Sequence, residues 1–165
     1  MGKFDLELLD NYKTIGSPEF KFYEKFKRGR RFNERDFVML MIILGCGNNV
    51  DKARMIFTEW DVDINKKIYK KDIGEIIASL NKIFVEAFVD LTIALEADEA
   101  NRELLESYRS ALNSGVQGGK KALTAIFFSA LGVVEVSEAD FIVLLGMKNP
   151  ELLTSYGYRK FIAKF

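Results

Sequence analysis

Residues 61–72 read DVDINKKIYKKD. Side chains that carry oxygen occupy the first, third, fifth and twelfth positions of this stretch, as Asp61, Asp63, Asn65 and Asp72. When about twelve residues curl between two helices, oxygens at these positions and the carbonyl of the seventh residue converge on one point, where a hard cation is bound. The sequence therefore predicts a metal site made of Asp61, Asp63, Asn65, Lys67, Tyr69 and Asp72.

Two residues weaken this predicted site. The sixth position requires a left-handed backbone and favours glycine, but it holds Lys66, which adds about 1 kcal/mol of steric cost. The twelfth position holds Asp72, whose side chain is one methylene shorter than that of the usual glutamate. We therefore expect weak Ca²⁺ binding, with Mg²⁺ as a competitor. The alternative is a loop that keeps its shape and binds no ion.

The flanking sequence predicts a helix on each side of the loop. Asn49 is expected to cap an entering helix that ends at Trp60, a core residue. The exit helix carries four apolar residues on one face: Ile73, Ile76, Ile77 and Leu80. Between them, Ile68 at the eighth position is expected to pair, as a short strand, with the loop of a neighbouring unit.

The spacing of the exit helix recurs in three other places along the chain. These copies are Phe37, Leu40, Met41 and Leu44; Leu123, Ile126, Phe127 and Ala130; and Tyr158, Phe161, Ile162 and Phe165. Within each half, the copies begin 36 (73 minus 37) and 35 (158 minus 123) residues apart. Near-equal periods of this length predict two pairs of helix-loop-helix units. A capping box at Ser137 to Asp140 supports this division. Within the fourth expected loop, Pro150 is expected to be the first residue of a short helix.

On these residues the chain resembles the EF-hand calcium-binding superfamily, which includes calmodulin, troponin C and the myosin light chains. The resemblance covers roughly residues 18–165, but only the loop at 61–72 has a specific motif. It implies an all-α fold with two EF-hand pairs and an extra helix between them. The other expected loops, at residues 26–36, 113–119 and 147–157, are basic or nearly lack carboxylates, and we expect no metal there.

The expected domains follow from this division. They are an N-terminal extension (1–16), a first EF-hand pair (17–82), an inter-lobe helix (83–100) and a degenerate second pair (101–165). The inter-lobe helix is apolar over most of its length, which favours a core helix. The alternative is an internal ligand that fills a groove otherwise used by a target helix.

Composition limits the function. The chain has 24 basic and 24 acidic residues, no histidine and one cysteine. The lack of histidine excludes catalytic sites that depend on it, and we expect no enzymatic activity. We also expect no transmembrane segment and no nucleic-acid partner, because no basic-aromatic platform is present. A cytoplasmic location is expected, with the cytoskeleton as one setting.

Two functions remain open at this point. The first is a non-catalytic, light-chain-like subunit that binds an amphipathic helix of a larger protein, such as a motor or an axonemal component. The second is a calcium-modulated regulator that uses the loop from Asp61 to Asp72 as its sensor.

Overall fold

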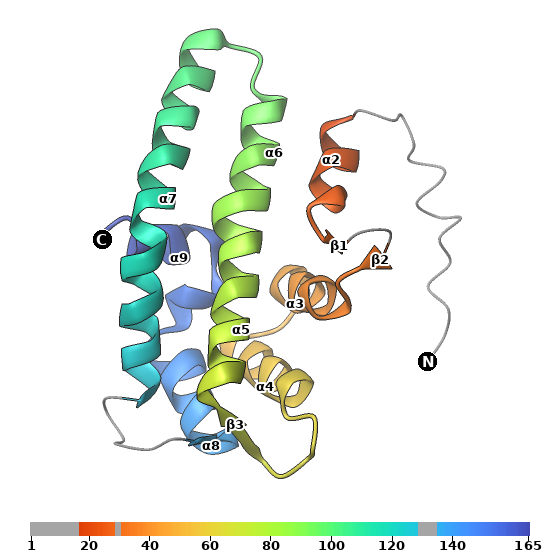
Figure 1. Cartoon of the computed structure of the whole chain (residues 1–165), viewed down its shortest axis with the longest axis vertical. Helices are drawn as coiled ribbons and strands as arrows, with labels where there is room; N and C mark the ends of the chain where they lie inside the picture. The colour runs from red at the N-terminus through yellow and green to blue at the C-terminus, as the bar shows by residue number, and fades with distance from the viewer. Residues whose placement is uncertain (1–16, 29–30, 129–134) are drawn as a thin grey trace.

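The computed structural model describes residues 17–28, 31–128 and 135–165 (Figure 1). These residues are mostly helical, so the expected all-α class is confirmed. The first half contains α2 (Pro18–Glu24), β1 (Lys27–Arg28), β2 (Arg31–Phe32), α3 (Glu34–Leu44), α4 (Asn49–Trp60), β3 (Lys67–Tyr69) and α5 (Lys70–Asn81). The predicted N-terminal extension, residues 1–16, lies outside the described residues.

The second half begins with a long helical rod that continues from α5. The rod runs from α5 through a π-helical turn, η1 (Lys82–Ala87), into α6 (Phe88–Leu95), and α7 (Glu99–Phe128) follows. The chain then forms β4 (Glu135–Ser137), α8 (Glu138–Phe141), η2 (Ile142–Lys148), η3 (Pro150–Leu153) and α9 (Ser155–Ile162). The rod formed by α5, η1 and α6 lies beside α7, and the upper part of this helical hairpin projects from the rest of the molecule (Figure 1).

Two short antiparallel strand pairs are present in the described part of the chain. β1 pairs with β2. β3 pairs with β4, and Ile68 lies opposite Val136. Both of these side chains are 0 % exposed. The predicted strand at Ile68 is therefore confirmed, but its partner comes from the second half of the chain and not from the first loop.

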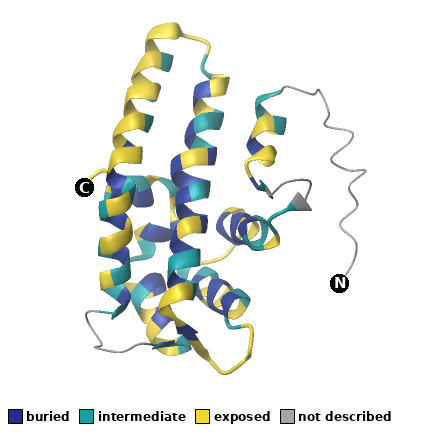
Figure 2. Ribbon diagram, viewed as in Figure 1, coloured by how far each residue is buried: buried dark blue, intermediate teal, exposed yellow. Residues whose placement is uncertain are grey.

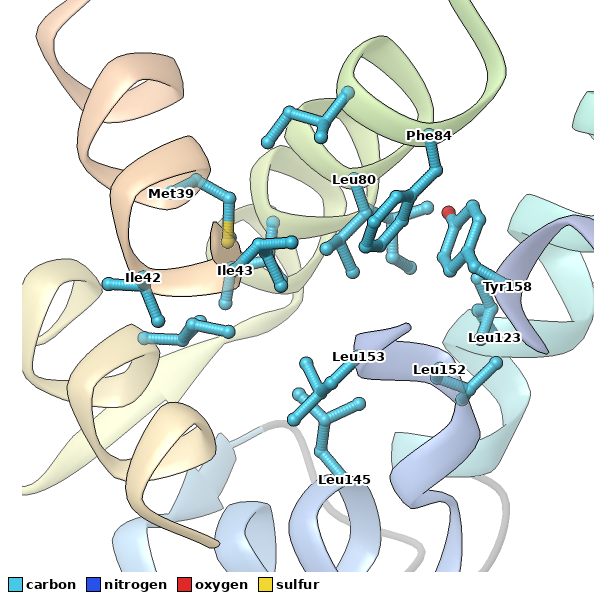
Figure 3. Packing of buried hydrophobic residues seen from close by; sticks show 14 of the residues in the cluster. Met39, Ile42, Ile43, Leu80, Phe84, Leu123, Leu145, Leu152, Leu153 and Tyr158 are labelled. Atoms are coloured by element: carbon cyan, nitrogen blue, oxygen red, sulfur yellow. The ribbon is translucent and has the colours of Figure 1, made fainter. Parts of the chain in front are cut away.

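The buried side chains form one hydrophobic cluster, to which both halves contribute. Figure 3 shows Ile43 of α3, Leu80 of α5 and Phe84 of η1 converging with Leu153 of η3 and Tyr158 of α9. The π-helical turn is buried around most of its circumference. This burial supports a core position for the first part of the expected inter-lobe helix (83–100), within η1.

The predicted third loop, at residues 113–119, is wrong, because these residues lie inside the continuous helix α7. The glycines of this stretch allow a close contact between α7 and α9 instead. A Cβ atom on Gly115 would lie 2.4 Å from the carbonyl oxygen of Ile162, and one on Gly119 would lie 2.4 Å from Cδ1 of the same residue.

The other helix starts are close to their predicted positions. Asn48, one residue before the predicted cap, accepts a hydrogen bond from the backbone N–H of Asp51 at 2.9 Å. Ser137 caps α8, as predicted, and Pro150 is the first residue of η3. These starts depend on local hydrogen bonds and backbone preferences, which a sequence pattern can report.

Candidate functional site: the loop between α4 and α5

The predicted loop lies between the two helices that the sequence suggested. α4 ends at Trp60, and α5 begins at Lys70 directly after β3. Trp60 is 2 % exposed, so its predicted place in the core is confirmed. The four apolar residues of the exit face are all buried: Ile73, Ile76, Ile77 and Leu80.

The backbone of the loop is left-handed at two residues. Lys66 has a φ of 61°, as its sixth position predicted, and Ile64 has a φ of 57°. The second value was not predicted, and it is unusual for a β-branched residue. Each left-handed residue costs roughly 1 kcal/mol, so the loop needs contacts that hold it in this shape.

The first carboxylate of the loop supplies those contacts. Oδ1 of Asp61 accepts a hydrogen bond from the backbone N–H of Asn65 at 3.1 Å, and Oδ2 accepts one from Lys66 at 3.0 Å. Both carboxylate oxygens of Asp61 therefore accept hydrogen bonds from the backbone of the left-handed turn. Hydrogen bonds from backbone amides to a carboxylate are charge-assisted and stronger than neutral ones.

The next two polar side chains bind each other. Nδ2 of Asn65 donates to Oδ2 of Asp63 at 2.7 Å, and Oδ1 of Asn65 accepts from the backbone N–H of Lys67 at 2.8 Å. Asp63 and Asn65 are exposed. These bonds keep the middle of the loop compact, and they occupy oxygens that a cation would use.

The last predicted ligand caps a helix. Asp72 lies in the first turn of α5, and its Oδ2 accepts a hydrogen bond from the backbone N–H of Tyr69 at 2.8 Å. A carboxylate at this position stabilises the start of a helix. Ligation of an ion by this oxygen would compete with the cap.

The oxygen donors of the loop have the chemistry that Ca²⁺ and Mg²⁺ prefer. In the described segments, however, no three Asp, Glu, Cys or His side chains are grouped closely enough to hold a metal ion. The predicted metal set is chemically suitable but not preformed, and it stays a prediction.

The lysines of the loop face acidic residues of the second half. Nζ of Lys67 donates a hydrogen bond to Oε1 of Glu135, which raises the pKa of the Lys67 ammonium group. Nζ of Lys66 lies 4.0 Å from Oε2 of Glu138. Both glutamates lie on β4 or the start of α8. The two pairs add charged contacts around the β3–β4 junction.

The segment opposite the loop has a related local arrangement. The sequence predicted its capping box, but not its position beside this loop. Ser137 Oγ accepts a hydrogen bond from the backbone N–H of Asp140 at 3.2 Å and donates one to Oδ2 of Asp140 at 2.6 Å. Ile68 pairs with Val136, and Asp72 and Asp140 each lie four residues after these paired residues, so the two aspartates have equivalent positions in the two segments. The available signal was this capping box together with the apolar residue just before it.

If Val136 takes the eighth position, as Ile68 does in its own loop, the twelve positions of this segment are residues 129–140. The first, third and fifth positions are then Ser129, Leu131 and Val133. The third and fifth have no side-chain oxygen, so this stretch has the wrong residues for a hard cation. Residues 129–134 lie outside the described part of the chain.

A polar cleft of about 500 Å³ lies beside Trp60, between α3 and α5. Its charged residues are paired with each other: Asp36 with Ser79 and Lys82 at 2.6 Å each, and Arg35 with Glu75 at 2.7 Å. The guanidinium group of Arg35 also lies 5.6 Å from the centre of the Trp60 ring. The polar residues of the cleft therefore serve as hydrogen bonds and ion pairs that join α3 to α5 and to the start of η1.

Among the helices that the structure describes, none is long and apolar enough to cross a membrane. Comparison of the chain with protein-family models, with curated proteins and with solved structures finds no match.

Proposed function

We propose that this protein is a non-catalytic, calmodulin-like subunit of the EF-hand type that binds a helical segment of a larger protein without requiring a metal ion. The observation that carries this proposal is the strand pair between β3 and β4. It joins two helix starts through Ile68 and Val136, each followed by a helix with an aspartate in its first turn. This is the arrangement expected of two paired EF-hand loops.

Exposed methionines support a binding role. Met41 on α3, Met55 on α4 and Met147 on η2 are 53 %, 56 % and 58 % exposed. Methionine is flexible and polarizable, and it adapts to the apolar face of a partner helix. Leu44, the last residue of α3, is 60 % exposed and is a further exposed apolar side chain. A motor or axonemal protein remains our expected source of the helix.

The hydrogen bonds within the loop support partner binding that does not require a metal ion. Asp61 and Asp72 already stabilise the backbone through hydrogen bonds from Asn65, Lys66 and Tyr69. These bonds already hold both ends of the loop in place, so the net effect of an ion on the angle between α4 and α5 is expected to be small. A small effect gives a small coupling free energy between metal and partner.

The experiment is affinity purification of the full chain from the cell that produces it, in chelator and in calcium. The helical segment of any stoichiometric partner is then synthesised, and its Kd for the purified chain is measured by calorimetry in both conditions. We expect equal Kd values, because a ligand without differential affinity for two states shifts neither. Failure to recover a stoichiometric partner in either condition would overturn the proposal.

A calcium-modulated regulator is the second candidate, and the left-handed backbone at Lys66, the sixth position of the loop, favours it. This loop already has a backbone shape that suits a cation loop, even though its side chains are turned elsewhere. A regulator predicts that Trp60 fluorescence and the binding of a hydrophobic dye change strongly at micromolar calcium, roughly 10⁻⁷–10⁻⁵ M. Unchanged signals in this range would leave only the constitutive subunit.

A further inference from the structure

The polar cleft beside Trp60 lies where three helices meet. Its walls come from the start of α3, from the end of α4, and from the side of α5 that continues into η1. α3 and α5 each carry buried, half-buried and exposed residues (Figure 2). Its volume of about 500 Å³ is within the range of pockets that bind a small molecule. The cleft is therefore large enough for a ligand of this kind.

One hydrogen-bond donor in the wall of the cleft has no acceptor. Nε1 of Trp60 is buried, and none of the described residues accepts a hydrogen bond from it. An indole N–H can only donate, and leaving it buried and unpaired is costly. Such groups are rare in folded proteins and need an explanation. An acceptor that comes from outside the chain would remove this cost.

The start of α3 adds donors to the same cleft. Asn33 is the N-cap residue of this helix, but its side chain makes no cap hydrogen bond. The backbone N–H groups of the first turn have no acceptor within the helix, and they favour a negatively charged ligand. Two acids of this turn, Glu34 and Asp36, oppose that preference. However, Asp36 is paired with Lys82, and Glu34 is exposed and does not line the cleft.

Arg35 already binds a carboxylate in the cleft. Its Nη1 donates one hydrogen bond to Oε2 of Glu75 at 2.7 Å, and both side chains are partly exposed. Exposed ion pairs of this kind contribute little to stability, so another carboxylate can replace that of Glu75. The guanidinium group also lies 5.6 Å from the centre of the Trp60 ring. Arg35 therefore lies between the exposed ion pair and the buried indole.

The lining limits the charge of the ligand. Its two basic side chains, Arg35 and Lys82, are balanced by two acidic ones, Asp36 and Glu75. Because the lining has no net charge, it does not offset the larger cost of removing a divalent anion from water. The methyl group of Ala78 adds an apolar part to the wall. These features favour a single carboxylate attached to an apolar body.

We propose that this cleft binds a small organic carboxylate. One carboxylate oxygen replaces Glu75 as the partner of the Arg35 guanidinium group, and the other accepts a hydrogen bond from the indole N–H of Trp60. Because Nε1 of Trp60 is buried, the ligand reaches it only when Arg35 leaves Glu75. The apolar body of the ligand lies against Ala78. The site is separate from the loop of Asp61 to Asp72, and it does not depend on the proposed function.

The test uses benzoate and benzamide, which share an aromatic ring and differ in the charge of the acceptor group. The chain has a single tryptophan, so its indole N–H gives one cross-peak in a proton–nitrogen NMR spectrum. Titration of the full chain with benzoate should move this cross-peak saturably and to lower field in the proton dimension, because a charge-assisted hydrogen bond forms. Benzamide should bind about tenfold more weakly, because it is neutral. Inorganic phosphate at equal ionic strength should also bind more weakly than benzoate.

Variants of exposed charged residues define the site. Glu75→Gln should tighten benzoate binding, because it frees Arg35 from a competing carboxylate, and misfolding does not produce a gain in affinity. Arg35→Gln should weaken benzoate binding by about tenfold or more. Arg102→Gln is the matched control and should leave the Kd unchanged. Arg102 donates to Glu99 at 2.8 Å, and its side chain is 37 % exposed, against 36 % for that of Arg35.

Any of four results with the wild-type chain or Glu75→Gln would overturn this assignment. They are an indole cross-peak that benzoate does not move, equal binding of benzamide, tighter binding of phosphate, and weaker benzoate binding by Glu75→Gln than by the wild type. Equal losses of affinity in Arg35→Gln and Arg102→Gln would overturn it as well, since they would show a general effect of charge and not a contact in the cleft.

Discussion

The hydroxyl group of Tyr158 donates a hydrogen bond to Oδ1 of Asn81 across 3.1 Å, inside the core. Both residues are buried, and the ring of Tyr158 lies 5.3 Å from that of Phe84 (Figure 3). Asn81 is the last residue of α5, and Tyr158 belongs to α9. A single polar contact thus ties the last helix of the chain to the point where the long rod changes from α-helix to π-helix.

Tyr158→Phe should lower the free energy of unfolding by about 1–3 kcal/mol, because it leaves the buried Oδ1 of Asn81 without a donor. Denaturant unfolding of both proteins measures this difference. Tyr156→Phe is the control, since Tyr156 is 72 % exposed. Equal losses for the two substitutions would show that the buried hydrogen bond has no net stabilising effect.

The same tyrosine should make stability depend on alkaline pH. Burial raises the pKa of the Tyr158 phenol above its ordinary value of 10.0. Its contribution to stability is therefore complete below the unfolded pKa, and it is lost as pH rises above about 10, because the unfolded state releases the proton more readily. Tyr158→Phe should flatten the decline in unfolding free energy between about pH 9 and pH 11. A decline that is unchanged in the variant would assign it to other groups.

Gly115→Ala should be strongly destabilising, by about 1–3 kcal/mol or more, because the new methyl group forces α9 away from α7. Gly74→Ala on α5 is the matched control, since a Cβ atom there has no neighbour within 4 Å. It should be stabilising by about 0.5–1 kcal/mol, through the better helix propensity of alanine. Thermal unfolding measures both; a neutral Gly115→Ala would contradict the close contact between α7 and Ile162.

Asp90 links the C-terminal end of α2 to the helical hairpin through ion pairs. Burial raises the pKa of the Asp90 carboxyl, but hydrogen bonds from Lys25 and Arg109 outweigh burial and lower it overall. Its contribution to stability is therefore present above the ordinary value of 3.8 and is lost as pH falls below it. Asp90→Asn should speed amide hydrogen exchange in α2 more than in α7. Exchange that accelerates equally in both helices would indicate global destabilisation instead.

The loop offers a test of backbone strain that is separate from metal binding. Lys66→Gly should stabilise the metal-free protein by up to about 1 kcal/mol, because it removes the cost of a left-handed lysine.

The combination of Lys66→Gly and Asp72→Glu should also tighten calcium binding, and Asp61→Ala should abolish calcium binding. Calorimetry should find at most one calcium ion per chain. Two sites of similar affinity would contradict our interpretation of the remaining loops.

Sequence alone was sufficient where the structure depends on neighbours in the chain. The helix starts near Asn49 and at Ser137 and Pro150, the left-handed backbone at Lys66 and the buried exit face after Asp72 all follow from local hydrogen bonds, backbone sterics or helical spacing. The metal-binding set, the EF-hand identity and the domain boundaries are predictions that the fold does not test.

Only the tertiary structure determined which segments meet. Ile68 has the properties of a pairing strand, but nothing local to it specifies Val136, which lies 68 residues later (136 minus 68), as its partner. The EF-hand resemblance led us to expect a loop at residues 113–119, and each glycine there weakens a helix by about 1 kcal/mol. In the folded protein, Gly115 and Gly119 stay helical because α9 approaches them more closely than any side chain would allow. Packing between distant segments therefore overrides a local preference of this size.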